Sequence, residues 1–421
     1  MFHPELHRGG AQQITYELFK ALKETPGVRP FFLAACDPEQ RAFFKAGARI
    51  TGFDGREGEF LFLTQGYDYW WHKTSSTLLL EGFAEFLLML KPDVVHFHHF
   101  LLLGLDLLTL TRRVLPNVKI IFTFHEFLAI CAADGQMLRT FDKSLCESAS
   151  PVRCHQCFPE RGPEQFFTRE LWVKRHLSVV DEFTVPSRFM IDFYTRWGLP
   201  AEKIHHVTNG QPDYSRGVIP FEERETRNRF GFFGQLVDNK GVWVILQAVR
   251  QLRAEGFCDF VVEINGDNLK YASAARRAEI EAFKEDEDSL PYDQRIVFFN
   301  GPYHVDQIAS RMARIDWCIV PSTWWEIFGL VISEAWMFKR PIIASNVGGP
   351  AERIRPDVDG LLFDRADGGS LAATLRRACE DPALWVHLRR NITPPKSGSF
   401  MRVKYMKIYQ NIRAESPDLP K

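Results

Sequence analysis

Two loops in the second half of the chain combine residue types that suit a phosphorylated sugar. The first runs from Gly234 to Gly241, between the end of an apolar segment and the start of a helical one, and it carries Lys240. Backbone N–H groups at a helix start attract anions, and the ammonium of Lys240 would add a full positive charge for a diphosphate. A plain turn between a strand and a helix is the alternative interpretation of this loop.

The second loop contains two glutamates that are eight positions apart. Glu326 precedes an apolar helical run, whereas Glu334 lies inside it. A wholly helical spacer would separate them by about 12 Å, which is too far for a paired acid and base but suits two points along an extended nucleotide sugar. Each carboxylate can accept hydrogen bonds from vicinal hydroxyls. Two solvent-facing glutamates on a surface helix are the alternative.

The elements that must position these loops alternate along the chain. Short apolar segments alternate with stretches of helical period, which is typical of parallel sheets covered by helices on both faces. A turn cluster from Asn209 to Pro212, followed by a polar stretch, predicts a domain boundary near residue 210. We expect a first helix over residues 10–23 and strands over 93–98, 118–124, 182–185, 230–233, 260–265, 296–299, 317–320, 341–344 and 361–363.

Composition and missing motifs exclude several classes of protein. The chain has 421 residues, with 52 Lys and Arg against 53 Asp and Glu, so no global positive field favours nucleic acid. The sequence has neither the glycine-rich dinucleotide motif nor a P-loop. Its most apolar stretch, Phe100 to Leu110, is much shorter than the roughly 20 residues that cross a bilayer. With no signal-like start and eight cysteines, we expect a cytoplasmic protein with reduced thiols.

The order of short motifs along nearly the whole chain resembles the retaining glycosyltransferases of family 4. The resemblance implies an α/β protein of GT-B fold, with two doubly wound Rossmann-like domains facing a cleft. It implies an acceptor-side domain at 1–210, a nucleotide-sugar-binding domain at 211–395 and a helix in 396–421 that returns to the first domain. The motifs are Gly9-Gly10, Val95 to His99, Thr123 to Glu126, Val185 to Ser187, Thr208 to Gly210, Gly234 to Gly241, Gly266-Asp267, the two glutamates, and Asn346 to Glu352.

The same resemblance implies roles for individual residues. Glu334 would hold the ribose hydroxyls, and Glu326 would hold the donor sugar. Lys240 would neutralise the diphosphate leaving group, and His125 would lie beside the reacting carbon. The alternative for His125 is a structural role, as a buried histidine whose ring is hydrogen-bonded to the backbone. His125, Glu326 and Lys240 are thus the expected catalytic residues. The rest of the donor site would be Gly9, Gly10, Gly234, Gln235, Gly266, Ile327, Phe328 and Gly329.

Two features depart from the family pattern. Gln235 stands where the family usually has arginine, so the loop has one cation fewer for the leaving group. Only eight residues precede Gly9, and they contain no apolar run. The first strand of the first domain is therefore expected to be missing, either because the chain as given starts downstream of its natural start or because the sheet is built without it.

We therefore expect a retaining glycosyltransferase that moves a sugar from a UDP-, GDP- or other nucleotide sugar to a saccharide or lipid-linked acceptor, in cell-surface polysaccharide synthesis. A sugar phosphorylase or epimerase of the same fold, and a non-catalytic nucleotide-sugar-binding protein, are the alternatives. No cofactor is expected for catalysis, because Lys240 and helix starts can stabilise the diphosphate. The mixed basic and apolar stretch Phe166 to Leu177 favours a core helix, with peripheral contact at the inner face of the membrane as the alternative.

Two groups of residues have metal-binding types. Cys131, Cys146, Cys154 and Cys157 fall in an insertion at 131–159 that follows His125 and lacks apolar periodicity. They could hold a structural zinc ion that orders the insertion, with free or disulfide-forming thiols as the alternative. His96, His98 and His99 also cluster at a strand end, but no carboxylate or cysteine follows at close spacing, so contact with the acceptor is favoured.

Overall fold

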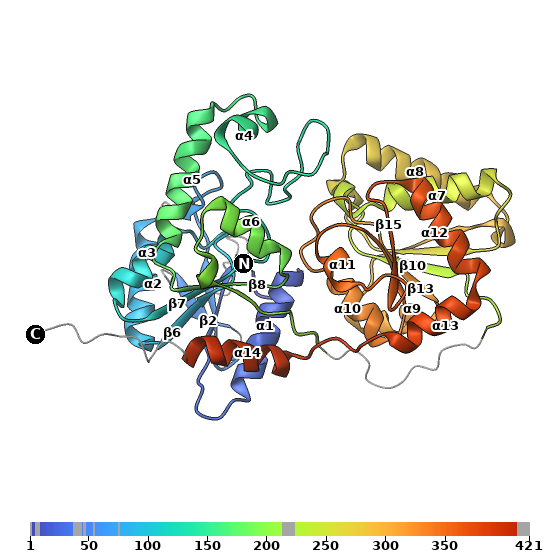
Figure 1. Cartoon of the computed structure of the whole chain (residues 1–421). Coiled ribbons are helices and arrows are strands. Elements are labelled where there is room, and N and C mark those ends of the chain that lie inside the picture. Colours follow the sequence, from blue (N-terminus) through green and yellow to red (C-terminus); the bar gives the residue numbers. More distant parts are fainter. Residues whose placement is uncertain are drawn as a thin grey trace, which may run out of the picture. The chain divides into compact units, whose positions relative to one another are not determined.

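The computed structural model describes residues 2–4, 9–36, 44, 48–53, 55–74, 76–212 and 224–410, and the chain divides into two compact units (Figure 1). The first unit comprises Met1–Gly210 and Lys396–Lys421, and the second comprises Gln211–Pro395. Both are built on parallel strands that alternate with helices, so the expected α/β class is confirmed. No helix among the described residues is long and apolar enough to cross a membrane.

The second unit contains a six-stranded parallel sheet in the order β12-β11-β10-β13-β14-β15. Numbered within the unit, this is the doubly wound order 3-2-1-4-5-6, which reverses direction between β10 and β13. Ligands of such sheets bind outside the carboxyl ends of the strands at this switch point. The strands are β10 (Arg229–Phe233), β11 (Val261–Asn265), β12 (Val297–Gly301), β13 (Trp317–Val320), β14 (Ile342–Ser345) and β15 (Gly360–Phe363).

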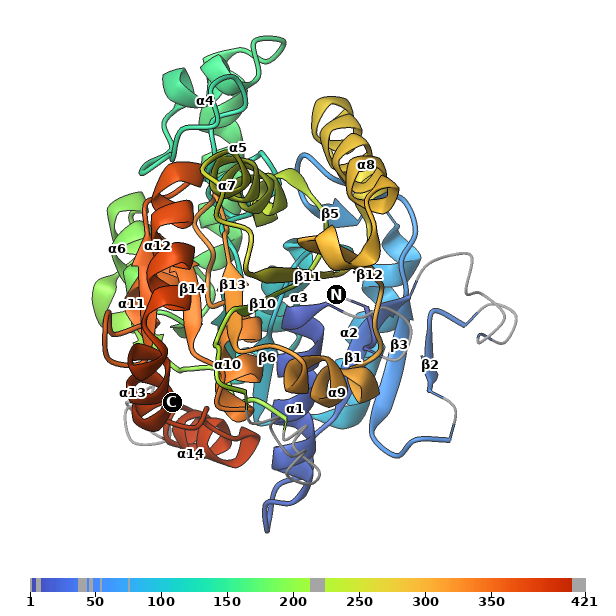
Figure 2. The same ribbon diagram turned by 90° about the vertical axis from the view of Figure 1, so that its right-hand side faces the viewer.

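Helices cover both faces of this sheet (Figures 1 and 2). Side chains alternate between the faces along each strand, so Ile319 and Ile343 belong to one hydrophobic core and Val320 and Ile342 to the other. The first core also takes residues from α7 (Val242–Ala254), α8 (Ala274–Ser289), α12 (Gly368–Glu380) and α13 (Pro382–Asn391), and the second from α9 (Ile308–Ala313) and α10 (Leu330–Met337). A further short helix is α11 (Gly348–Arg353).

The first unit contains a four-stranded parallel sheet in the order β6-β7-β8-β9. Its strands are β6 (Val94–Phe97), β7 (Lys119–Thr123), β8 (Glu182–Val185) and β9 (Ile204–His206). A smaller sheet pairs β3 (Glu59–Leu63) with β1 (Phe32–Cys36) in parallel and with β2 (Ile50–Gly52) in antiparallel orientation, and β4 (Tyr67–Asp68) pairs with β5 (Lys73–Thr74). The local sequence pattern of this region predicts none of these strands.

The helices of the first unit include the expected one over residues 10–23, with the same bounds. They are α1 (Gly10–Lys23), α2 (Thr77–Leu90), α3 (Asp106–Val114), α4 (Pro151–Cys157), α5 (Pro163–Leu177), α6 (Phe189–Trp197) and α14 (Gly398–Gln410). The last of these lies beside α1 (Figure 1). Tyr405 of α14 is buried and its hydroxyl contacts Thr123 Oγ1 and Thr184 Oγ1 at 3.1 and 3.2 Å, so this helix closes one end of the β6–β9 sheet.

The described residues ahead of α1 form no strand. Phe2 makes an isolated parallel bridge with Ala35 of β1. His3 is fully buried, and its Nε2 lies 2.8 Å from Glu59 Oε2. Residues 5–8 lie outside the described part of the chain, so the prediction of a missing first strand keeps its status as a prediction.

Candidate functional site

The loops that follow β10 and β13 meet at the switch point of the second unit. Gly241 is the N-cap residue before α7 and has a φ of 75°, and a Cβ there would lie 1.8 Å from the carbonyl oxygen of Pro321. Gly266, in the loop after β11, could not carry a Cβ either, because it would lie 1.7 Å from the carbonyl oxygen of Gly234. Both glycines are therefore explained by the close approach of neighbouring backbones.

Lys240 and Glu326 form an ion pair across these loops. Lys240 Nζ donates to Glu326 Oε2 at 2.7 Å, and the same oxygen accepts from Ser322 Oγ at 2.9 Å and Trp324 Nε1 at 3.1 Å. Burial acts to raise the pKa of the Glu326 carboxyl, but the charge of Lys240 and these three hydrogen bonds outweigh it. The pKa of Glu326 therefore lies below its ordinary value, and the group is a carboxylate at neutral pH.

Lys240 keeps the capacity to bind a further anion. Its side chain is 30% exposed, and an ammonium has three N–H donors, of which one serves Glu326. The neighbouring Gln235 is exposed and brings no charge. Sequence reasoning missed another nearby cation, Arg365, whose guanidinium donates to the carbonyl oxygen of Thr323 at 2.8 Å.

Glu334 lies on α10 and is buried. It is 8% exposed, and burial raises the pKa of its carboxyl to about 7. Among the described residues, no hydrogen bond or ion pair to this carboxyl is found. Buried polar groups in proteins normally have partners, so an unpartnered carboxyl with a raised pKa at a switch point is a candidate for ligand binding.

Hydrogen bonds from Arg353 and Gly349 fix the loop between the two glutamates. Arg353 donates to the carbonyl oxygens of Phe328 and Gly329, both at 2.9 Å, and its guanidinium lies 3.8 Å from the centre of the Phe328 ring. The Gly349 N–H donates to the carbonyl oxygen of Glu326 at 2.7 Å, and a Cβ at Gly349 would lie 2.3 Å from the carbonyl oxygen of Ile327. The glycines of the Asn346 to Glu352 motif therefore support this loop, and Arg353, which directly follows the motif, was missed from sequence.

Histidines gather at the carboxyl ends of β6 and β7 in the first unit. His98 Nδ1 lies 3.1 Å from His125 Nε2, and His96 contacts Tyr409 Oη at 2.8 Å and Thr123 Oγ1 at 2.7 Å. Burial lowers the pKa of His96 to about 3 and that of His125 to about 4, so these rings are neutral at pH 7. Among the described residues, the hydrogen-bond partner found for the His125 ring is another histidine, His98.

The remaining expected residues of the first unit lie on other elements. Gly10 is the first residue of α1 and is exposed, and Gly9 precedes it with an ordinary extended backbone. His99 Nε2 lies 3.3 Å from Glu126 Oε1, and burial raises the pKa of Glu126 to about 8. In the described part of the chain, no three His, Cys, Asp or Glu side chains have metal-binding geometry. The expected cysteines Cys131, Cys146, Cys154 and Cys157 nevertheless line one small cavity.

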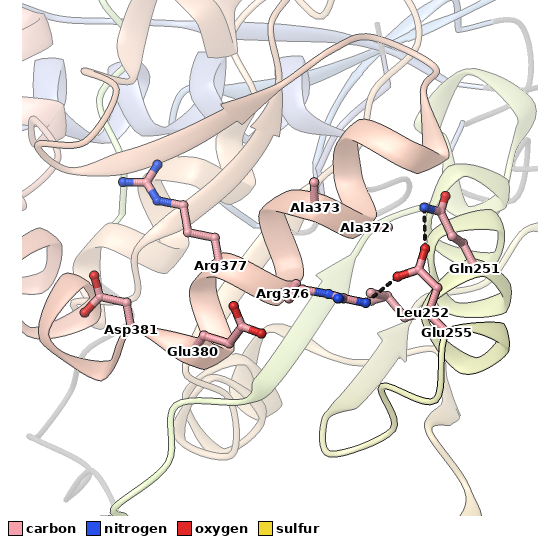
Figure 3. A pocket seen from close by; sticks show the side chains of 9 residues that line it. All are labelled: Gln251, Leu252, Glu255, Ala372, Ala373, Arg376, Arg377, Glu380 and Asp381. Atoms are coloured by element: carbon pink, nitrogen blue, oxygen red, sulfur yellow. Dashed lines mark hydrogen bonds and ion pairs between the residues drawn. The ribbon is translucent and has the colours of Figure 1, made fainter.

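A larger cavity of about 480 Å³ lies between α7 and α12, away from the switch point (Figure 3). Three of its charged side chains already have partners: Arg376 and Gln251 both donate to the carboxylate of Glu255, and Arg377 forms an ion pair with Asp357 at 2.8 Å. Because these groups are already paired, we assign the candidate site to the switch point and not to this surface groove.

Comparison with known sequences identifies the family. Residues 8–211 match glycosyltransferase family 4, and residues 227–381 match the glycosyl transferases group 1. The D-inositol 3-phosphate glycosyltransferase of Rhodococcus opacus is 30% identical over 186 residues, which are 44% of this chain and 40% of that protein. The chain spans about half the length of the curated relatives it matches, with 40%, 58% and 47% covered in three of them.

Solved structures share the fold over nearly the whole chain. The sucrose-phosphate synthase of Thermosynechococcus elongatus is 18% identical, with a TM-score of 0.67 that covers 97% of this chain and 94% of that one. HepE of Anabaena, solved in complex with UDP and glucose, is 16% identical, with a TM-score of 0.60 and 95% of both chains covered. The expected family and fold are thereby confirmed: the chain belongs to the family 4 glycosyltransferases and has the GT-B fold.

Proposed function

We propose that this chain is a retaining glycosyltransferase that takes its sugar from a nucleoside diphosphate sugar. The observation that carries the proposal is the buried, unpartnered carboxyl of Glu334 at the switch point that also holds the Lys240–Glu326 ion pair. A nucleoside diphosphate sugar has groups complementary to both: ribose hydroxyls that donate hydrogen bonds, and phosphates that accept them.

The donor is proposed to bind along these loops. Glu334 accepts hydrogen bonds from the two ribose hydroxyls, which favours its ionised form and draws its raised pKa downward. Lys240 stabilises the diphosphate as charge develops on it during transfer. UDP is the first nucleotide to test, because the structurally similar HepE was solved with UDP and glucose.

The sugar is proposed to contact Glu326 and the backbone from Ile327 to Gly329. Arg353 and the packing of Gly349 fix this loop before substrate arrives, and such preorganisation reduces the cost of positioning the sugar. His125 is proposed to contact the sugar during transfer, where its neutral imidazole can accept or donate a hydrogen bond. We propose no cofactor for this reaction.

The acceptor is proposed to be a saccharide or a lipid-linked saccharide of cell-surface polysaccharide synthesis. On α5, Phe166, Val173 and Leu177 are buried in the first unit, as a core helix requires. Phe167 and Leu171 on the same helix are each 52% exposed. These two residues are the basis for the proposal that the enzyme, in the cytoplasm, makes peripheral contact with the inner face of a membrane.

Two measurements test the proposal in sequence. A panel of nucleotide sugars is first screened for thermal stabilisation, where a ligand at 100 times its Kd adds about 2.7 kcal/mol. The stabilising donor is then incubated with saccharide acceptors, and the product's anomeric configuration is read by NMR. Transfer with the donor's configuration kept supports the proposal. Inverted product, phosphate-dependent cleavage, epimerised sugar, or binding without any turnover would each refute it and would indicate a different reaction or a binding protein.

A further inference from the structure

Four cysteines from three segments of the first unit line one small cavity. Cys131 ends a turn that starts at Phe127, and Cys146 donates its backbone N–H to the carbonyl oxygen of Met137. The other two cysteines, Cys154 and Cys157, belong to α4. The cavity has a volume of about 20 Å³, which is roughly the room that one water-sized occupant needs. The lining cysteines are Cys131, Cys146, Cys154 and Cys157.

The segment that carries three of these cysteines has no core of its own. From Arg139 to Gln165 no residue is buried, and the apolar side chains of Phe141 and Val152 are 57% and 62% exposed. Figure 1 shows α4 and the loop before it at the outer end of α5. Apolar burial is the dominant favourable term in folding, so an ordered segment without it requires another constraint.

A buried cation that interacts with two of these cysteines has no ionised partner among the described residues. Arg169 is 4% exposed, and its guanidinium donates to two backbone carbonyls, at 2.7 and 3.3 Å, and lies 3.2 Å from the Nε2 of His72. No carboxylate in the described part of the chain lies within 4.0 Å of it, and Glu126, which interacts with it at longer range, has a pKa raised to about 8 by burial. The thiols of Cys131 and Cys154 are also among its electrostatic neighbours. Because buried charges are normally paired, a negative group is expected at this position.

We propose that Cys131, Cys146, Cys154 and Cys157 bind one zinc ion as four thiolates. Each thiol releases its proton as its sulfur bonds to the metal, and no atom changes oxidation state. Four thiolates around a divalent ion leave two net negative charges. Three guanidinium groups are available to offset these charges: those of Arg139 and Arg153, which line the cavity, and that of Arg169, which interacts with Cys131 and Cys154.

Zinc binding requires the four thiols that line this cavity to move closer together. No three potential ligands among the described residues already stand in metal-binding geometry, so the thiols must turn inward to reach sulfur–zinc distances of about 2.3 Å. Cys154 and Cys157 are three residues apart on α4, a spacing that puts both side chains on one helix face. The site needs neither the donor nor the proposed transfer reaction, so the two proposals can fail separately.

Elemental analysis of the full chain, purified without chelator, tests the proposal. We expect about one zinc per chain, lost in the double variant Cys154→Ser/Cys157→Ser and kept in Cys258→Ser, which changes an exposed cysteine of the second unit. Well under one zinc per chain, a disulfide among the four cysteines, or equal zinc in the double variant would overturn it.

A second measurement does not depend on the folding of a variant. The zinc of the unaltered chain is exchanged for cobalt(II), which gives thiolate-to-metal charge transfer and strong visible bands only in a tetrahedral thiolate site. After chelation, trypsin should cut faster at Lys143, Arg153 and Arg161, while stabilisation of the second unit by UDP should not change. Absence of the cobalt bands, or tryptic cutting that is the same with and without metal, would contradict the proposed site.

Discussion

Replacing Lys240 with methionine tests the ion pair at the centre of the candidate site. Methionine keeps most of the side-chain volume but removes the ammonium, so Glu326 would remain 8% exposed with only Ser322 and Trp324 as donors. Lys240→Met should therefore destabilise the protein and also slow sugar transfer. The first effect reports on the structure, and the second on the proposed role of Lys240.

The structure sets the size of the loss of stability. Breaking a fully buried ion pair from one side costs about 3–5 kcal/mol. The side chain of Lys240 is 30% exposed and two neutral donors stay on Glu326, so the expected cost in free energy of unfolding is smaller, about 1–2 kcal/mol.

The pH dependence has a definite sign. The pKa of Glu326 is lowered in the folded protein, so its pairing contributes stability above the unfolded pKa of about 4.3 and loses it as the pH falls through the folded value. Lys240→Met removes that contribution. The difference in stability between the two proteins should thus be full at pH 7 and disappear in acid below the folded pKa.

Urea unfolding of a double-mutant cycle provides the assay. The single variants are Lys240→Met and Glu326→Gln, and the double variant replaces both charges. We expect the double variant to recover part of the loss seen in Lys240→Met, because no buried carboxylate is left unpaired. If Lys240→Met unfolds like the unaltered protein at pH 7, or if the two substitutions are additive, the reasoning from this ion pair is refuted.

Three further predictions address other parts of the site. Glu334→Gln should lower UDP affinity about 10-fold or more by calorimetry, since a hydrogen bond to a charged group contributes about 1.5–3 kcal/mol; unchanged affinity would contradict the proposed ribose contact. Because the pKa of the Glu334 carboxyl is raised to about 7 in the folded protein, the variant should also gain stability relative to the unaltered chain as the pH rises from 5 to 8, as measured by urea titrations. Gly241→Ala should lower the free energy of unfolding by several kcal/mol, because the added Cβ meets the Pro321 carbonyl. Gly256→Ala, with a similar φ of 76° and nothing within 4 Å of its Cβ, should lower it by only about 1 kcal/mol. Equal urea midpoints for the two variants would show that the backbone contact at Gly241 does not add to the loss of stability. Arg353→Lys should lower kcat more than it weakens UDP binding, because it loosens the Phe328–Gly329 loop; a loss confined to UDP affinity would contradict that positioning role.

Local sequence patterns predicted the elements of the second unit well. Parallel strands buried on both faces read as short continuous apolar runs, and all six expected ranges from residue 230 onward overlap β10 to β15. The strands not predicted from the sequence are β1 to β5 and β9, of which β4 and β5 have two residues each and β2 and β9 have three. Such short strands contain too few residues for a period to be recognised.

The chemistry of the site was only partly visible in the sequence. The positions of Glu326 before a helix and Glu334 inside it follow from local pattern, and α10 (Leu330–Met337) confirms both. The pairing of Glu326 with Lys240 joins residues 86 positions apart, and Arg353 reaches back 25 positions to Phe328.

These contacts depend on which strands are neighbours in the sheet. The order that places β10 beside β13 is set by the packing of helices on both faces, and no stretch of local sequence encodes it. The burial that raises the pKa of Glu334, and the meeting of four cysteines at one cavity, have the same origin. The sequence determined which residues could do chemistry and on which elements they lie, whereas the tertiary structure decided which of them meet, because only the packed chain brings distant segments within hydrogen-bonding distance.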